Sequence, residues 1–281
     1  RYLYLPDTWK NNTGYTFGDR NNARYINGVD EAALGNPNVT WEVSKEINLA
    51  LDTRFFRSKL SVTYEYFIRN RSNILSYRGT VPAIVAANLP PYNLGKVKSW
   101  GHNFEVRYNE NIGEFNFFMN ANGAIQRNKI IYRDEAVFPG LEYQASTGRP
   151  NGQQLLLTAD GLYTSWSQLY AMDGNGNPIL SQPVRALKDG SPYTDINGNP
   201  VYVKDLGFGG RALQPGDIRL VDVNGDGLIN EKDRVRQGYA TAPVYSYGVT
   251  VGFRFKGFDV SALFAGMAGV ARGAMNTYHF A

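Results

Sequence analysis

The stretch Tyr245-Ser-Tyr-Gly-Val-Thr-Val-Gly-Phe-Arg-Phe255 alternates apolar residues with small or polar ones throughout its length. A β-strand places successive side chains on opposite faces, so this alternation predicts a strand with one apolar and one polar face. Lys256-Gly257 follows as a turn, and the alternation resumes from Phe258, with Leu263 as an exception on the polar side. The stretch therefore predicts a β-hairpin that is apolar on one face.

Four further alternating runs lie upstream, and they form two more predicted hairpins. The first hairpin turns at Arg57-Ser58 and the second at Asn111-Ile112-Gly113. The apolar sets of the four runs are Ile47, Leu49, Leu51 and Phe55; Leu60, Val62, Tyr64, Tyr66 and Ile68; Phe104, Val106 and Tyr108; and Phe115, Phe117, Met119 and Ala121. Phe67 and Phe118 break the pattern, because they fall on the polar side. The chain thus predicts six antiparallel strands in an all-β fold.

The connections between the hairpins are much longer than the turns within them. The predicted organisation is a loop over 1–40, two hairpins over 41–127 with a loop at about 70–97, an excursion over 128–241, a hairpin over 242–271, and the start of another loop over 272–281. The clusters Asp173-Gly-Asn-Gly-Asn-Pro178 and Asp195-Ile-Asn-Gly-Asn-Pro200 predict small hairpins inside the excursion. Short turns that alternate with long loops are typical of antiparallel transmembrane β-barrels of bacterial outer membranes, which have short periplasmic turns and long extracellular loops.

Composition excludes several other classes of protein. The chain has 281 residues, of which 43% are hydrophobic and 14% aromatic, and it has no apolar run of about 18 residues that would predict a transmembrane helix. The net charge of +4 is scattered, so no nucleic-acid-binding stripe is predicted. There is no cysteine, there are only two histidines, and no Gly-x-Ser-x-Gly nucleophile elbow is present. These absences predict a protein that is not an enzyme.

A candidate metal site lies in the stretch Asp222-Val-Asn-Gly-Asp-Gly-Leu-Ile-Asn-Glu-Lys-Asp233. The oxygen-bearing residues have the spacing of an EF-hand-type calcium loop, and Gly227 stands where that loop turns sharply. The predicted ligands are the side chains of Asp222, Asn224, Asp226 and Asp233 and the carbonyl of Leu228. The alternative is a cluster of Asx and glycine turns without a metal. No pair of amphipathic helices flanks the loop, so a structural Ca²⁺ in a β-rich protein is the prediction.

Four stretches of the chain resemble the SusC/RagA family of TonB-dependent outer-membrane transporters. They are Gly35-Asn-Pro-Asn38 followed by Trp41-Glu42, Asn93-Leu-Gly-Lys-Val-Lys-Ser-Trp-Gly101, Gly216 to Arg234, and Tyr247 to Asp259. These stretches occur in the family's order across most of residues 35–266, and their combination is specific although each alone is weak. The excursion between Arg127 and Gly216 carries no matching motif.

The resemblance implies a part of a larger barrel of about 22 strands. It further implies a Bacteroidetes-type cell envelope and the import of oligosaccharides or peptides through the outer membrane. The implied partners are a SusD-like surface lipoprotein that caps the extracellular mouth, TonB acting through parts outside this sequence, and outer-membrane lipid. Six strands are also fewer than the roughly eight of the smallest single-chain bacterial barrels, so the first and sixth strands are expected to pair with strands outside this sequence.

The competing hypothesis is a soluble, calcium-stabilised, β-rich glycan-binding module. Its aromatic residues Tyr163, Trp166 and Tyr170 could stack on sugar rings, or they could pack within the excursion. A soluble β-sandwich also has alternating strands, but it rarely contains so long an insertion at one strand crossing. Solubility separates the two hypotheses, because a module of this size dissolves without detergent and barrel strands do not.

Overall fold

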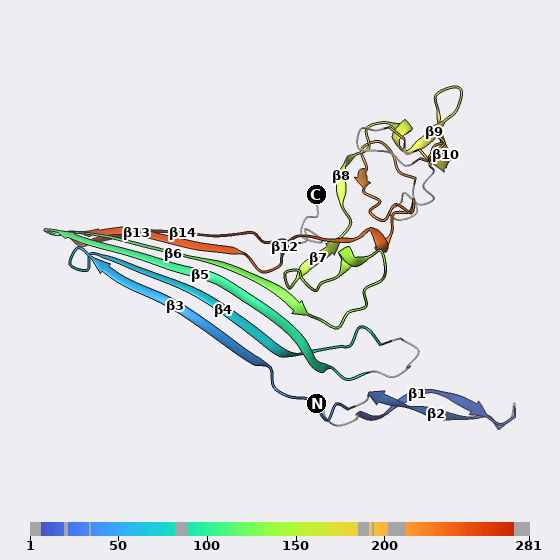
Figure 1. Cartoon of the computed structure of the whole chain (residues 1–281), viewed down its shortest axis with the longest axis horizontal. Helices are drawn as coiled ribbons and strands as arrows, with labels where there is room; N and C mark the ends of the chain where they lie inside the picture. The colour runs from blue at the N-terminus through green and yellow to red at the C-terminus, as the bar shows by residue number, and fades with distance from the viewer. Residues whose placement is uncertain are drawn as a thin grey trace. The chain divides into compact units, whose positions relative to one another are not determined.

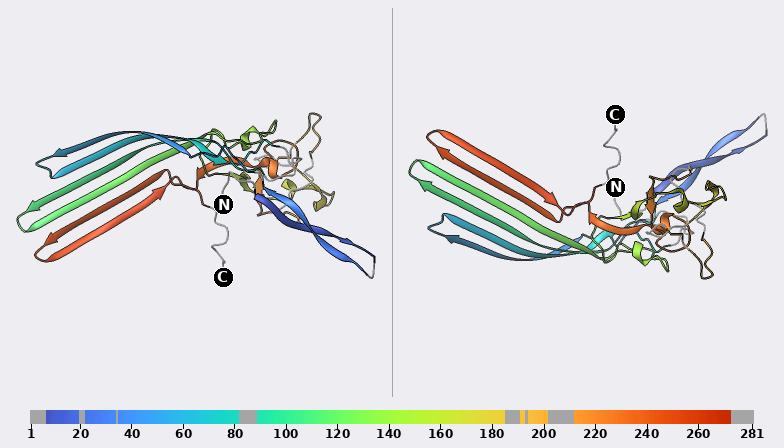
Figure 2. Two further views of the ribbon diagram at one scale, coloured as in Figure 1. Left: turned by 90° about the horizontal axis from the view of Figure 1, so that it is seen from below. Right: turned by 90° about the horizontal axis from the view of Figure 1, so that it is seen from above.

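A computed structural model describes residues 7–19, 22–33, 35–81, 89–184, 191–192, 194–201 and 212–272. Its largest element is a six-stranded antiparallel sheet in the order β14-β13-β6-β5-β4-β3 (Figure 1). The strands are β3 (Val43–Phe55), β4 (Leu60–Ser76), β5 (Tyr92–Ile112), β6 (Phe115–Tyr132), β13 (Tyr245–Phe255) and β14 (Phe258–Ala268). Figure 2 shows these strands side by side, with the three tight turns at one end of the sheet and the longer connections at the other. The six strands predicted from the alternation are confirmed.

The register of the sheet aligns the apolar side chains of all six strands on one face. Residues paired across antiparallel strands point to the same side of the sheet. One such row runs Thr53, Val62, Val106, Ala121, Val249 and Phe264. Large apolar side chains on this face are exposed in the isolated chain, for example Leu49 at 65% and Phe258 at 73%. An apolar surface that is continuous across six strands requires a nonpolar environment, which lipid provides.

The aromatic exceptions on the polar face have a structural reason. Phe67 lies opposite Gly101, and Phe118 lies opposite Gly252. A Cβ atom on Gly252 would stand 2.4 Å from the Phe118 ring, and the guanidinium of Arg254 lies 5.5 Å from the centre of that ring. Each ring therefore covers a glycine on the neighbouring strand, an arrangement that shields the backbone and fixes the register.

Several predicted boundaries differ from the structure. The strands extend further into the loop at about 70–97 than the alternation indicates, since β4 ends at Ser76 and β5 begins at Tyr92. Within residues 1–40, predicted as a loop, β1 (Asp7–Phe17) and β2 (Arg24–Ala33) pair as a hairpin with an irregularity between Asn12 and Tyr15. Described side chains of this hairpin, such as Tyr25, are exposed. The described part of the hairpin is not covered by a core, and its sequence has no apolar alternation that would have identified these strands. Residues 273–281 of the predicted final loop lie outside the described residues.

A second compact unit comprises residues 137–145 and 154–237. The strands of this unit are short: β7 (Gln153–Leu156), β8 (Ala159–Leu162), β9 (Tyr170–Met172), β10 (Pro178–Pro183), β11 (Ile218–Leu220) and β12 (Val235–Ala240). β7 and β12 extend beyond the boundaries of the unit. Its 3₁₀ helices are η2 (Glu142–Gln144), η3 (Trp166–Gln168) and η4 (Glu231–Asp233). β9 and β10 pair around the turn at Asp173, and Thr194 pairs with Pro200 around the turn at Asp195. Both small hairpins predicted inside the excursion are therefore confirmed. Among the described residues, no helix is long and apolar enough to cross a membrane.

The two faces of β13 should tolerate a charge very differently. Val249 lies midway along the apolar face of the sheet, whereas its neighbour Thr250 points to the polar face. In the full-length protein in lipid, Val249→Arg should lower the free energy of unfolding by about 2–4 kcal/mol, the cost of a cation at the bilayer midplane. Thr250→Arg is the matched control and should change it by less than about 1 kcal/mol, a surface-like effect. Equal losses in urea titrations of the two variants would contradict the assignment of the faces.

Candidate functional site

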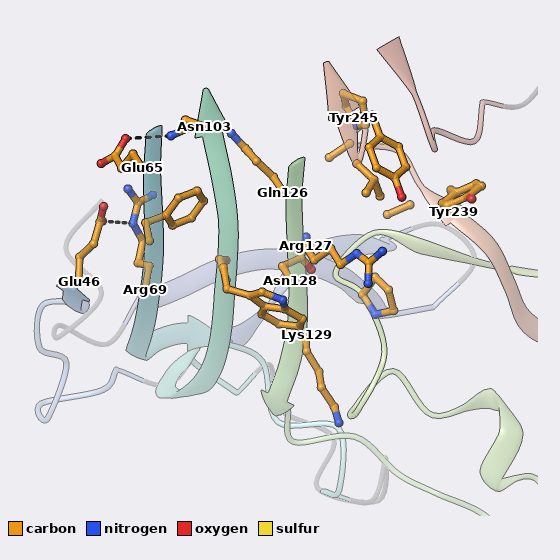
Figure 3. A pocket seen from close by; sticks show the side chains of 18 of the residues that line it. Glu46, Glu65, Arg69, Asn103, Gln126, Arg127, Asn128, Lys129, Tyr239 and Tyr245 are labelled. Carbon is orange, nitrogen blue, oxygen red and sulfur yellow. Dashed lines mark hydrogen bonds and ion pairs between the residues drawn. The ribbon is translucent and has the colours of Figure 1, made fainter. Parts of the chain in front are cut away.

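The polar face of the sheet carries charged side chains that pair with one another. Arg69 on β4 forms an ion pair with Glu46 on β3, and the side-chain amide of Asn103 on β5 donates to Glu65 on β4 at 3.0 Å (Figure 3). At the turn end, Arg254 pairs with Asp259 at 2.8 Å. Each pair joins neighbouring strands, so the charges are held in place and remain hydrated. Such a lining suits a water-filled lumen.

A cavity of about 770 Å³ lies over the polar face, at the end of the sheet away from the tight turns. Its lining from β3 to β6 includes acidic, basic, amide and aromatic side chains: Glu46, Glu65, Phe67, Arg69, Asn103 and Gln126. Residues 148–150 and 238–245 close it on the side of β6, where Arg127 and Lys129 also join the lining (Figure 3). The volume is within the range of small-molecule sites. The lining mixes hydrogen-bond donors and acceptors with the rings of Phe67, Trp100, Tyr239 and Tyr245, which suits a polar organic ligand.

Two stretches that carry the family resemblance contact each other through asparagines. Asn36, 2% exposed, donates to the carbonyl of Pro91 at 3.0 Å and accepts from the N–H of Asn38 at 3.0 Å. Asn93 accepts from the N–H of Thr40 at 2.9 Å and donates to its carbonyl at 2.8 Å, so its amide pairs with the Thr40 backbone as a neighbouring strand would. These side chains tie the entry of β3 to the start of β5. Sequence analysis missed this role, because nothing in the spacing shows that the two stretches are neighbours.

Two acidic residues at the end of β6 secure the loops that begin there. Asp134 is 8% exposed, accepts from the Thr80 hydroxyl at 2.8 Å and pairs with Arg78 at 3.5 Å. Glu135 accepts from the N–H groups of Ser146 and Thr147 and, at 2.6 Å, from the Ser146 hydroxyl. Partial burial of Glu135 opposes its ionisation, but these hydrogen bonds outweigh burial and lower its pKa to about 2. The consecutive acidic residues were visible in the sequence, but their partners are distant in it.

The predicted calcium ligands lie in one loop, where their oxygens accept hydrogen bonds from backbone N–H groups. Asp222 accepts from Gly225 at 2.7 Å and from Gly227 at 2.8 Å. Asn224 accepts from Asp226 at 3.0 Å, and Asp226 accepts from Leu228 at 2.8 Å. Gly225 and Gly227 have φ of 75° and 83°, so the sharp turn predicted at Gly227 is present.

Asp233 occupies the last position of the loop and is fully buried. Its two oxygens accept from the N–H groups of Val223 and Asn230, both at 2.8 Å, which ties the two ends of the loop together. Tyr143 donates its hydroxyl to the carbonyl of Lys232 at 2.6 Å. Burial and then the negative charge of Asp233 raise the pKa of Tyr143. The loop is thus a compact, acidic structure inside the second unit.

The oxygens of this loop are of the type that calcium prefers, and an oxygen that accepts one hydrogen bond retains a lone pair. Within the part of the chain that the structure describes, however, no three acidic, histidine or cysteine side chains gather closely enough to hold a metal ion. The site at Asp222, Asn224, Asp226, Leu228 and Asp233 therefore stays a prediction.

Of the three aromatic residues that were candidates for stacking on a sugar, Tyr163 and Tyr170 pack within the excursion. Tyr163 and Tyr170 are 6% and 4% exposed and form a buried cluster with Leu169 and Leu213. The Trp166 ring lies 6.2 Å from that of Tyr170 and remains partly exposed. Tyr163 and Tyr170 are therefore core residues of the second unit, and they are not available to stack on a sugar ring.

A sheet with one continuous apolar face and one ion-paired polar face is the wall of a transmembrane β-barrel. The family model described as "TonB dependent receptor-like, beta-barrel" matches residues 5–267. The chain belongs to this family, which confirms the resemblance seen in the sequence. Family membership also favours the barrel over the soluble glycan-binding module.

Named relatives and solved structures agree with this assignment. TonB-dependent receptors P3 and P39 of Formosa agariphila are 22% and 25% identical, over 87% and 85% of this chain and 22% and 23% of their own lengths. The RagAB peptide importer in its closed-closed state is similar in fold, with a TM-score of 0.60 at 17% identity, over 96% of this chain and 25% of that one. A second RagAB peptide transporter structure has a TM-score of 0.56 at 18% identity. The chain thus spans about a quarter of the length of the relatives it matches.

Calcium binding can be tested by titration of the calcium-stripped full-length protein. Wild type should bind one Ca²⁺ at this loop, and Asp226→Ala should abolish binding by removing one of the predicted oxygen ligands. Asp173→Ala is the control, because Asp173 also accepts from backbone N–H groups in an Asx turn but lacks the twelve-residue loop. Absence of binding by wild type up to about 1 mM Ca²⁺, the weak end of such loops, would contradict the prediction.

The stability that the hydrogen bonds from Ser146 and Thr147 to Glu135 contribute should decrease at low pH. The pKa of Glu135 in the folded protein, about 2, lies below the ordinary value of 4.5, so the carboxylate stabilises the fold at neutral pH. This contribution should be lost as the pH falls from about 4.5 through about 2. At pH 7, Glu135→Gln should accelerate hydrogen exchange at the amides of Ser146 and Thr147. Glu142→Gln, the control, should leave those amides unchanged, because Glu142 accepts from Gly140 instead.

Proposed function

We propose that this chain is the substrate-contacting part of an outer-membrane, TonB-dependent importer of oligosaccharides or peptides. The observation that carries the proposal is the cavity of about 770 Å³ over the ion-paired polar face of the sheet. This sheet belongs to the β-barrel of a TonB-dependent receptor-like family. In a closed barrel this face borders the lumen, so a solute that crosses the barrel contacts Glu46, Glu65, Arg69 and Asn103.

The chemistry of the lining supports a polar organic cargo of either kind. Glu65 and Asn103 offer hydrogen-bond acceptors and donors to hydroxyl or peptide groups, and Phe67 offers an apolar surface. Similarity to a RagAB peptide importer favours peptides, and the mixture of charges fits their termini and side chains. The protein carries its cargo without a catalytic step.

Two partners belong to the proposal. A SusD-like surface lipoprotein covers the extracellular mouth, where the long connections lie, and TonB supplies energy through parts of the protein outside this chain. Relatives in Formosa agariphila and the fold of the RagAB structures support a Bacteroidetes-type outer membrane as the location.

Transport can be tested in cells that express the full-length protein as their sole copy. Glu46→Gln removes the acidic partner of Arg69 in the cavity and should reduce uptake of a labelled oligopeptide or oligosaccharide severalfold, because it frees a cation in the path of the solute. Arg254→Gln is the matched control, since Arg254 forms the same kind of pair on the same face but does not line the cavity.

The outcomes separate the parts of the proposal. Reduced uptake of one cargo class alone identifies that class. Uptake that persists when TonB is deleted would contradict energy coupling by TonB. Equal uptake by Glu46→Gln, Arg254→Gln and wild type, with equal amounts of assembled protein, would contradict the assignment of this cavity to the path.

A further inference from the structure

Six asparagines of the chain directly precede a glycine, and this pair of residues is chemically unstable. The backbone nitrogen of the glycine can attack the side-chain carbonyl carbon of the asparagine, and glycine has no side chain that would obstruct the approach. The attack displaces ammonia, so it converts a neutral residue into an acidic one. The six asparagines are Asn27, Asn122, Asn151, Asn175, Asn197 and Asn224.

The conformation of the chain decides which of these pairs reacts. The glycine nitrogen needs to be free of a hydrogen bond, and the asparagine needs access to water. Asn27 and Asn122 lie in β2 and β6, where pairing with neighbouring strands holds the backbone extended. The other four asparagines lie outside the strands, so the backbone N–H groups of the glycines that follow them can be compared directly.

In three of these four pairs the glycine N–H is already hydrogen-bonded. Gly176 and Gly198 each donate to the carbonyl of the aspartate three residues earlier, at 3.1 and 3.0 Å. Gly225 donates to the carboxylate of Asp222 at 2.7 Å. The nitrogen that would have to attack the asparagine is therefore engaged in each of the three pairs.

Asn151 differs from the other three asparagines. Within the part of the chain that the structure describes, neither its side chain nor the N–H of Gly152 forms a hydrogen bond, and both residues are exposed. Gly152 has a φ of 84°, and Gln153 donates its N–H to the carbonyl of Pro150 at 3.2 Å. Residues 150–153 therefore form a type II turn with Asn151 at its exposed corner.

We propose that Asn151 is a site of spontaneous deamidation. The backbone nitrogen of Gly152 loses its proton to water and forms a bond to Cγ of Asn151. The bond from Cγ to the side-chain nitrogen breaks, and this nitrogen takes up a proton and leaves as ammonia. Water then opens the resulting five-membered succinimide ring at one of its two carbonyl carbons, which gives aspartate or isoaspartate. One water enters and one ammonia leaves, and nothing is oxidised or reduced.

The reaction changes a turn that borders the cavity. The N–H of Asn151 donates to the side-chain oxygen of Asn128 at 2.6 Å, and Asn128 and Pro150 both line the cavity (Figure 3). Isoaspartate carries the main chain through Cβ and Cγ, which lengthens the turn by one atom. The longer turn loses the bond to Asn128 and the bond from Gln153 to Pro150. The proposal rests on the geometry of this turn and is independent of the cargo.

The test follows deamidation in the full-length protein in lipid, kept in warm, mildly alkaline buffer, by peptide mapping with mass spectrometry that locates each modified residue. Asn151 should gain about one mass unit severalfold faster than Asn175 and Asn197, which are also exposed. In protein denatured with urea the three sites should react at similar rates, because the hydrogen bonds that distinguish them are lost. Asn151→Gln should abolish the gain at this position, since the longer side chain cannot form the five-membered ring. Equal rates at the three sites in the folded protein, or no gain at Asn151, would overturn the proposal.

Hydrogen exchange tests the effect on the turn. In deamidated protein the amides of residues 151 and 153 should exchange severalfold faster, because both lose their acceptors. Asn151→Asp is the matched control, since it adds the same charge but keeps the length of the main chain, and it should exchange at the wild-type rate. Unchanged exchange in protein that contains isoaspartate at position 151 would overturn the inferred change in the turn.

Discussion

Backbone hydrogen bonding across the sheet is the constraint on which the rest of the structure depends. In lipid no water is available to satisfy an unpaired N–H or C=O group, so every strand needs a partner on both sides. Within the described residues, β3 and β14 pair on one side only, at the two ends of the sheet order. A sheet edge that lies in lipid needs a further strand to pair with it. The same ladders set the register, and a slip of one residue would exchange the apolar and polar faces.

The register is reinforced where it would be easiest to lose. A glycine in a strand has no side chain to pack, and several glycines lie in this sheet. Phe67 covers Gly101 and Phe118 covers Gly252 on the polar face, while Phe104 covers Gly123 on the apolar face, where a Cβ would lie 2.3 Å from its ring. A shift of the pairing would place these rings against residues with side chains and create clashes. The aromatic exceptions to the alternation thus help to fix the strand register, which the alternation alone specifies only weakly.

The alternation predicted the six strands and their faces because period-two patterning is a local property of the sequence. The hairpin β1–β2 could not be found in this way, since its described side chains, such as Tyr15 and Tyr25, are exposed and its polar residues resemble those of turns. The roles of Asn36, Asn93 and Glu135 were equally hidden, because each depends on a partner that the fold brings close. In the calcium-like loop, spacing predicted a sharp turn at Gly227, where φ is 83°. Spacing could not decide whether the oxygens bind a cation or only the backbone of their own loop.

Hydrogen bonds and an ion pair hold the long connections at the points where they join the sheet. Asp134 holds the segment after β4 through Thr80 and Arg78, and the adjacent Glu135 holds Ser146 and Thr147. Both acidic residues directly follow β6. The loop after β4 and the loop after β6 are therefore both attached to the end of one strand. A loop tied at its base can change in length or sequence without moving the strand that carries it. The cavity lining on β3 to β6 can therefore keep its geometry when a connection changes in length or sequence.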